Sequence, residues 1–286
     1  MKKIWIFLFA ILMFSSLAYV FNLEKGLKVY ISVDMEGIAG VVSGGEVSSR
    51  GHDYDYFREI MTLETNAAVE GAIAAGAVEI VVRDGHGAKT NILPGLLHKK
   101  AKLFRGITDR PENMMLGIDE TFDAVMFIGY HAKAGTADGV LAHTSSGNVI
   151  DFSINGISLP EAGYNALVAG LYEVPVVLVA GDNWICEQVK NMFGNVETVE
   201  TKVGFGSAEL GLHPEVARAK IKEKTVRALR DLSRFKPYKL QAPYTMVLKV
   251  KKEKPLYPGA ERTAENEFTF TSPDLLKVLD AFNKMK

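Results

Sequence analysis

The sequence has one cysteine, Cys186, among its 286 residues, and this scarcity excludes two kinds of chemistry. A single cysteine cannot form an internal disulfide, and a zinc site held by thiolates needs several cysteines. Any metal bound by this chain must therefore be held by histidine, aspartate and glutamate. Cys186 falls in a predicted helix, where a thiol is usually buried and inert.

The chain also lacks an excess of charge of either sign. It has 33 basic and 34 acidic residues, for a formal net charge of -1, so nothing favours nucleic acid or an anionic membrane surface as a partner. Hydrophobic residues make up 48% of the sequence, which is an ordinary globular composition. The length permits one large domain, or a main domain with a small appendage, with a core that needs no disulfide.

Long apolar runs are absent except at the start of the chain. Lys2 and Lys3 precede an apolar run over residues 4–14, and Ser16 and Ala18 supply the small residues of a cleavage site. This pattern predicts a signal peptide over residues 1–18 and therefore an exported protein, periplasmic or extracellular. The alternative is a retained segment that anchors the protein in the membrane, because the apolar stretch approaches the length of a span.

Apolar strands alternate with helical patterns along most of the remaining chain. Strands are predicted at residues 28–33, 78–82, 124–128 and 174–180, and helices at 54–75 and 161–172. Apolar strands separated by helices indicate an α/β fold, with a mostly parallel sheet covered by helices on both faces. We assign residues 27–200 to this α/β domain, which also contains the candidate metal-binding and catalytic residues considered below.

The pattern of predicted strands and helices changes after about residue 200. A charged helix is expected from Pro214 to about residue 232, followed by strands at 244–250 and 267–271 and a last helix from Pro273. We interpret residues 201–286 as a smaller α+β part.

Polar residues of ligand type follow several of the predicted strands. Asp34 and Glu36 follow the first strand, and residues two apart in an extended chain point to the same side. Two such carboxylates would repel each other, and a divalent cation between them removes the repulsion. Taken alone, the pair could equally be a turn or a helix cap.

Three further residues complete the candidate metal ligands. His86 and His131 each follow a strand beside glycine, and Glu161 follows Pro160 at a predicted helix start. Each has an ordinary explanation, as a loop histidine or as an acid in the first turn of a helix. Together, three carboxylates and two imidazoles suit a divalent ion, and one carboxylate could bridge a metal pair. His143 lies in a polar loop, where it is either a general acid or base or a surface histidine.

Five motifs occur in a characteristic order: SVDMEGIAG, DGHGAK, GYHAKAG, LAHTSS and PEAGYNALVAG. In this order and spacing, over residues 28–198, they resemble the DppA-type D-aminopeptidase family of zinc metallopeptidases. The resemblance implies two zinc ions per subunit, with Asp34 as the bridging ligand. It also implies that Glu36, His86, His131 and Glu161 are ligands and that His143 is the catalytic residue.

The resemblance further implies hydrolysis of short peptides or amides with N-terminal D-amino acids, of the D-Ala-D-Ala type. Members of this family form ten-subunit rings around an internal chamber, so the resemblance implies a homo-oligomer, and a decamer in particular. The familiar member is cytoplasmic, whereas this chain begins with an export-type segment. Two other hypotheses stay open: a metal-dependent esterase or deacylase, and an exported solute-binding protein that does not catalyse.

Overall fold

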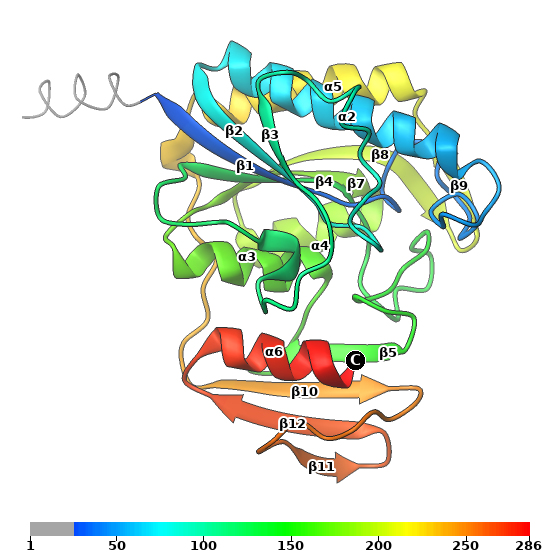
Figure 1. Cartoon of the computed structure of the whole chain (residues 1–286), viewed down its shortest axis with the longest axis vertical. Helices are drawn as coiled ribbons and strands as arrows, with labels where there is room; N and C mark the ends of the chain where they lie inside the picture. The colour runs from blue at the N-terminus through cyan, green and yellow to red at the C-terminus, as the bar shows by residue number, and fades with distance from the viewer. Residues whose placement is uncertain (1–25) are drawn as a thin grey trace, which may run out of the picture.

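The predicted apolar strands form one seven-stranded sheet in the computed structural model, which describes residues 26–286 (Figure 1). The order across the sheet is β3-β2-β1-β4-β7-β8-β9. Neighbours are parallel except for β8 and β9, which form an antiparallel pair at one edge. The strands are β1 (Leu27–Val33), β2 (Ala77–Asp84), β3 (Ala101–Phe104), β4 (Ala124–Tyr130), β7 (Val176–Asp182), β8 (Glu197–Phe205) and β9 (Ala208–Gly211).

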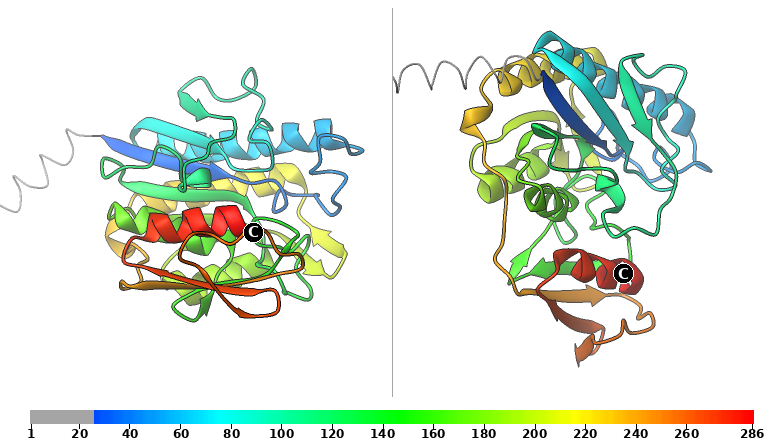
Figure 2. Two further views of the ribbon diagram at one scale, coloured as in Figure 1. Left: turned by 60° about the horizontal axis from the view of Figure 1, so that its bottom comes forward. Right: turned by 60° about the vertical axis from the view of Figure 1, so that its left-hand side comes forward.

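The central strands are buried on both faces because helices cover the sheet from both sides (Figures 1 and 2). Every residue of β4 and β7 is buried, which explains why these segments are continuous apolar runs rather than alternating ones. The helices α2 (Tyr54–Ala74) and α5 (Pro214–Leu229) pack together on one face. The helices α3 (Glu161–Leu171) and α4 (Asn183–Phe193), with the 3-10 helix η1 (Asn113–Met115), lie on the other. The predicted fold class is confirmed.

A second, antiparallel sheet lies beyond the α3 face, at the bottom of Figure 1. Its order is β11-β12-β10-β5-β6, and helix α6 (Leu275–Met285) packs against it. The rings of Phe152 in β5 and Phe282 in α6 stack with centroids 3.9 Å apart, so the core of this sheet is continuous with that of the α3 face. The strands are β5 (Val149–Ile154), β6 (Ile157–Ser158), β10 (Tyr244–Val250), β11 (Glu261–Ala264) and β12 (Glu267–Ser272); a 3-10 helix, η2 (Leu232–Arg234), precedes β10.

The two sheets do not divide the chain at residue 200, where the sequence placed a boundary. Strand β8 runs through that position, and α5 packs against α2 on the main sheet. In the other direction, β5 comes from the middle of the chain and pairs with β10 in the second sheet. The smaller sheet is therefore assembled from two separate segments, which composition along the chain does not reveal.

The signal-peptide prediction for residues 1–18 lies outside the described residues. Within residues 26–286, no helix has the length and apolar character that a membrane span requires.

Candidate metal centre

The ligand-type residues meet where the order of strands reverses. Strand β1 is followed along the chain by β2 on one side, and β4 lies on its other side. The strands end in register, because Val33 of β1 pairs with Asp84 of β2 and with Ile128 of β4. Parallel sheets bind ligands at this switch point, beyond the carboxyl ends of their strands.

Four of the predicted site residues follow strands that end at this edge, and the other two lie in segments that approach it. Asp34 and Glu36 follow β1, His86 follows β2, and His131 follows β4 directly. Glu161 is the first residue of α3, and His143 lies in the loop that joins β4 to β5. All six predicted residues therefore come together, from segments up to about half the chain apart.

Two glycines allow the first and third of these segments to approach closely. The Gly37 N–H donates to the Gly129 carbonyl at 2.8 Å. A Cβ at Gly37 would lie 1.9 Å from the Tyr130 carbonyl oxygen, and one at Gly129 would lie 2.2 Å from that of Asp34. Gly129 also has a φ of 73°, in the left-handed region that favours glycine. Side chains at these positions would separate the Asp34 and His131 segments.

Two groups of three ligand atoms share Asp34. In the first, Nδ1 of His86 lies 3.1 Å from an Asp34 oxygen and 3.1 Å from a Glu36 oxygen. In the second, Nε2 of His131 lies 3.5 Å from the other Asp34 oxygen and 3.5 Å from Glu161. Within each group the ligand atoms lie within 4.8 Å of one another. Asp34 thus presents one oxygen to each group, which is the arrangement of a bridging carboxylate.

The histidines are oriented by backbone carbonyls. Nε2 of His86 lies 2.8 Å from the Val47 carbonyl, and Nδ1 of His131 lies 3.0 Å from that of Ala132. A carbonyl only accepts, so each of these nitrogens carries a hydrogen and donates it. The opposite nitrogen of each ring then points its lone pair at the carboxylates. Metal-binding histidines are commonly fixed in this way.

Two buried polar atoms that lack hydrogen bonds within residues 26–286 also indicate that the ligand-type residues fit a divalent metal. Oε2 of Glu36 and Nε2 of His131 are buried and make no hydrogen bond among the described residues. Buried polar atoms without a partner are costly, and a cation between the side chains would satisfy both. Imidazole nitrogen and carboxylate oxygen are both ligands of zinc.

Electrostatics favours the ionised carboxylates. Burial would raise the pKa of Glu36, but His86, His131 and His143 outweigh it and hold that pKa well below its ordinary range. The pKa of Glu161 falls to about 2, because the charge of the nearby His131 imidazole outweighs burial and the repulsion of Asp34. In the same way, burial opposes but does not overcome the carboxylates that raise the pKa of His131 well above its ordinary value. A metal would replace these protons on the histidines.

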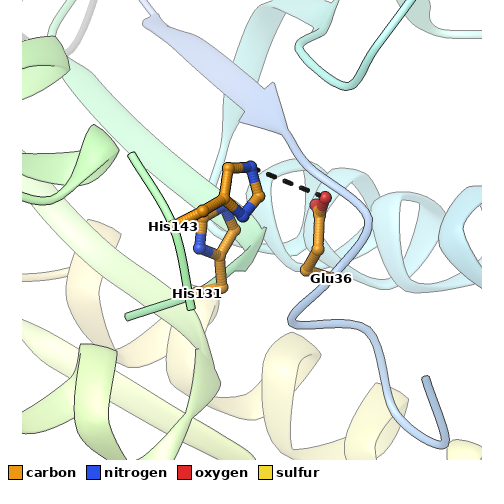
Figure 3. Close-up of side chains that lie close together, drawn as sticks. All are labelled: Glu36, His131 and His143. Atoms are coloured by element: carbon orange, nitrogen blue, oxygen red, sulfur yellow. Dashed lines mark ion pairs between the residues drawn. The ribbon is translucent and has the colours of Figure 1, made fainter. Parts of the chain in front are cut away.

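His143 differs from the other two histidines in its exposure. Its side chain is 26% exposed, whereas that of His131 is 1% exposed. Its Nδ1 donates to the Leu141 carbonyl at 2.8 Å, so its Nε2 is left facing the cluster, 3.9 Å from Glu36 and 3.6 Å from Glu161. Figure 3 shows the His143 ring beside that of His131, with Glu36 opposite. A base in this position can reach both the cluster and solvent.

Three residues that support the site were not singled out in the sequence. The Ser145 N–H donates to Glu161 Oε1 at 2.6 Å, and the Asp182 carboxylate accepts the Ala132 N–H at 3.3 Å beside His131. Lys202, fully buried in β8, donates to the Glu36 carbonyl at 2.9 Å and also to that of Val41. No local signal marked these three residues, because β8 (ETVETKVGF) is largely polar in sequence and all three contacts depend on the fold.

The fold and the site together define a class: α/β proteins with a divalent-metal centre of carboxylates and imidazoles at the carboxyl edge of a parallel sheet. Within that class, the chain belongs to the D-aminopeptidase family (Peptidase_M55), whose model matches residues 27–284. The resemblance seen in the motifs is thereby confirmed.

Two similar proteins support this assignment. A D-aminopeptidase of Bacillus subtilis (strain 168) is 36% identical over 264 residues, covering 89% of this chain and 95% of the relative. A solved structure described as the Zn-dependent D-aminopeptidase DppA from Bacillus subtilis, a self-compartmentalizing protease, matches with a TM-score of 0.86 and 34% identity. That match covers 90% of this chain and 96% of the other.

Proposed function

We propose that this protein is a zinc-dependent aminopeptidase that hydrolyses short peptides or amides with an N-terminal D-amino acid, of the D-Ala-D-Ala type. The observation that carries the proposal is the pair of three-ligand groups that share Asp34. Family membership supports the activity, and the Zn dependence printed for the solved relative supports the metal.

In this proposal two zinc ions are held per subunit. Asp34, Glu36 and His86 form one site, and Asp34 with His131 and Glu161 forms the other, so Asp34 is the bridging ligand. Bound zinc would polarise the scissile carbonyl and lower the pKa of water toward about 7.

The residues of the chain would supply orientation and proton transfer. The carboxylates around the cluster are positioned to hold the free amino group of the substrate, which would restrict cleavage to the first peptide bond. Nε2 of His143 carries no hydrogen in the neutral tautomer, so it can take a proton and deliver it to the leaving amine. Its partial exposure gives it access to the substrate.

We further propose assembly and location. The similar solved structure is described as self-compartmentalizing, which supports a homo-oligomer, and a decamer is the specific proposal. The segment over residues 1–18 has the pattern of a signal peptide, which supports export to the periplasm or beyond the cell, or anchoring to the membrane if it is retained.

The stereochemistry of the substrate tests the proposed activity. The protein should release D-alanine from D-Ala-D-Ala and leave L-Ala-L-Ala intact, as measured by chromatography of the products. Cleavage of simple esters or acylated amines, with neither dipeptide cleaved, would replace this proposal with an esterase or deacylase. Tight binding without turnover of any of these compounds would favour a solute-binding role.

A further inference from the structure

A lysine from the second sheet reaches the loop that carries His143. Lys286 follows α6, and its ammonium donates to Ser145 Oγ and, at 2.8 Å, to Asn283 Oδ1. Figure 1 places this end of α6 beside β5 and the loops of the main domain. Residue 286 thus contacts a loop 141 positions earlier in the chain.

This contact brings the ammonium close to the metal centre. Ser145 uses its N–H to bind Glu161, one of the candidate ligands, at 2.6 Å. A single residue therefore separates the Lys286 charge from the ligand cluster.

A second lysine lies in the loop that carries His86. Lys89 lies in the loop after β2, three residues beyond His86, and its ammonium donates to the Gly85 carbonyl. The described partners of both ammonium groups are neutral oxygens. Across residues 26–286, no carboxylate forms an ion pair with either lysine.

Two partly buried ammonium groups whose described hydrogen-bond partners are all neutral oxygens favour the binding of an anion. Burial lowers the pKa of Lys286 to about 8 against the negative charge of Glu161, and the positive charge of Lys89 adds to the lowering. An ammonium has three hydrogens to donate, and two of those of Lys286 are used. One therefore remains for a ligand.

We propose that Lys286, assisted by Lys89, binds the free carboxylate of a short peptide substrate and thereby sets a preference for dipeptides. This rests on the proposed aminopeptidase function, in which the scissile carbonyl lies at the metal cluster. In a dipeptide the free carboxylate belongs to the residue that follows the scissile carbonyl. In the structure, Ser145 alone lies between the Lys286 ammonium and the ligand Glu161, so the spacing is similar. A longer or amidated peptide has no charge at that position.

The test compares D-Ala-D-Ala with its C-terminal amide. The wild-type protein prefers the free acid, and Lys286→Met reduces the ratio of kcat/KM between acid and amide by roughly 10- to 100-fold, mainly through KM. Lys286→Arg, which keeps the charge, restores most of the preference. Lys89→Met reduces it in the same direction.

Lys284→Met is the matched control, because Lys284 is an exposed lysine two residues earlier, in the last turn of α6, paired with Asp280. It should keep the wild-type preference. A merely structural role for Lys286 would slow cleavage of acid and amide alike, so an unchanged ratio in Lys286→Met overturns the inference.

Binding distinguishes this inference from the function on which it rests. Calorimetry of the His143→Ala variant with the free acid and the amide should show tighter binding of the acid, and adding Lys286→Met should remove the difference. If wild-type protein cleaves neither peptide, the proposed function fails, but the binding comparison still decides the role of Lys286. Equal binding of acid and amide would refute the inference even if turnover is observed.

Discussion

The imidazole rings of His131 and His143 stack, with their centroids 4.1 Å apart and their planes 14° from parallel. His131 is buried and faces Asp34 and Glu161, whereas His143 is partly exposed. The pair thus extends from the interior of the cluster to solvent, and the two rings are suited to different roles. This difference supports the proposed roles, in which His131 holds metal and His143 exchanges protons with substrate.

Replacing His143 with alanine should separate these roles. We expect the variant to retain both metals, because His143 is not among the five proposed ligands, and to lose roughly 10²- to 10⁴-fold in kcat, the usual contribution of a general acid or base. Steady-state kinetics and metal analysis of the same preparation provide the check. His52→Ala is the control, since the His52 side chain is 91% exposed and has no proposed role in the site. An unimpaired His143→Ala enzyme would remove the residue from the mechanism.

Asp34→Asn, unlike His143→Ala, should lose its bound metal. Asparagine keeps the shape of the side chain but loses the charge and one ligand oxygen, and this residue belongs to both ligand groups. We expect the variant to lose metal from both sites, as measured by elemental analysis after gel filtration, while the His143→Ala protein retains it. Two metals per chain in Asp34→Asn would contradict the bridging assignment.

Glu64 should make stability depend on pH. Its carboxyl is fully buried, and burial raises its pKa from 4.5 to about 7, although the Ala39 N–H and Lys202 oppose the rise. Between these two values the folded protein binds more protons than the unfolded chain, so the free energy of unfolding falls as pH rises. The stabilising contribution is fully present below the unfolded pKa and is lost as pH rises through about 7.

The Glu64→Gln variant isolates this effect. Its amide does not ionise, so the stability difference between wild type and variant should shift by about 2.5 kcal/mol between pH 5 and pH 8, in favour of the variant at high pH. Urea denaturation at several pH values measures it. A difference independent of pH would show that Glu64 is already ionised in the folded protein.

Lys202 should position the segment that carries Glu36. Its ammonium binds two carbonyls of this segment and lies 3.2 Å from Glu209. Lys202→Met would leave Glu209 and the carbonyls without their cation, at a cost of about 3 kcal/mol or more. Because the Glu36 segment would loosen, affinity for metal should fall as well.

Denaturation and competition for zinc with a chelator measure the two effects of Lys202→Met. Lys190→Met is the comparison, because Lys190 forms an exposed pair with Glu200 that is worth less than about 1 kcal/mol. If Lys202→Met lowered stability but left metal affinity unchanged, the residue would be structural without positioning the ligand.

The convergence of the candidate ligands could be predicted from the sequence, whereas the way the chain divides between the two sheets could not. Asp34, His86 and His131 follow separate strands, and parallel strands end at one edge, so their convergence follows from local patterns alone. Most of the elements that these patterns did predict, such as β10, were located to within a residue or two, whereas β3, β5, β6, β8, β9 and β11 were not predicted. Strand ends carry this information because apolar runs stop where the chain leaves the core.

The remaining features depend on contacts that are distant in sequence. Pairing of β5 with β10 assigns part of the middle of the chain to the second sheet, and no local signal states that pairing. Nothing near Lys286 in the sequence distinguishes it from a surface lysine, and only the packing of α6 brings it to Ser145. Such contacts are set by tertiary packing rather than by periodicity.

The most direct test of the account is a zinc titration of the metal-stripped protein, with hydrolysis of D-Ala-D-Ala as the readout. The account predicts no activity without metal and recovery that reaches its maximum at about two zinc ions per chain, the number that the two ligand groups sharing Asp34 can hold. Full activity in the stripped protein, or a maximum at one zinc ion per chain, would contradict it.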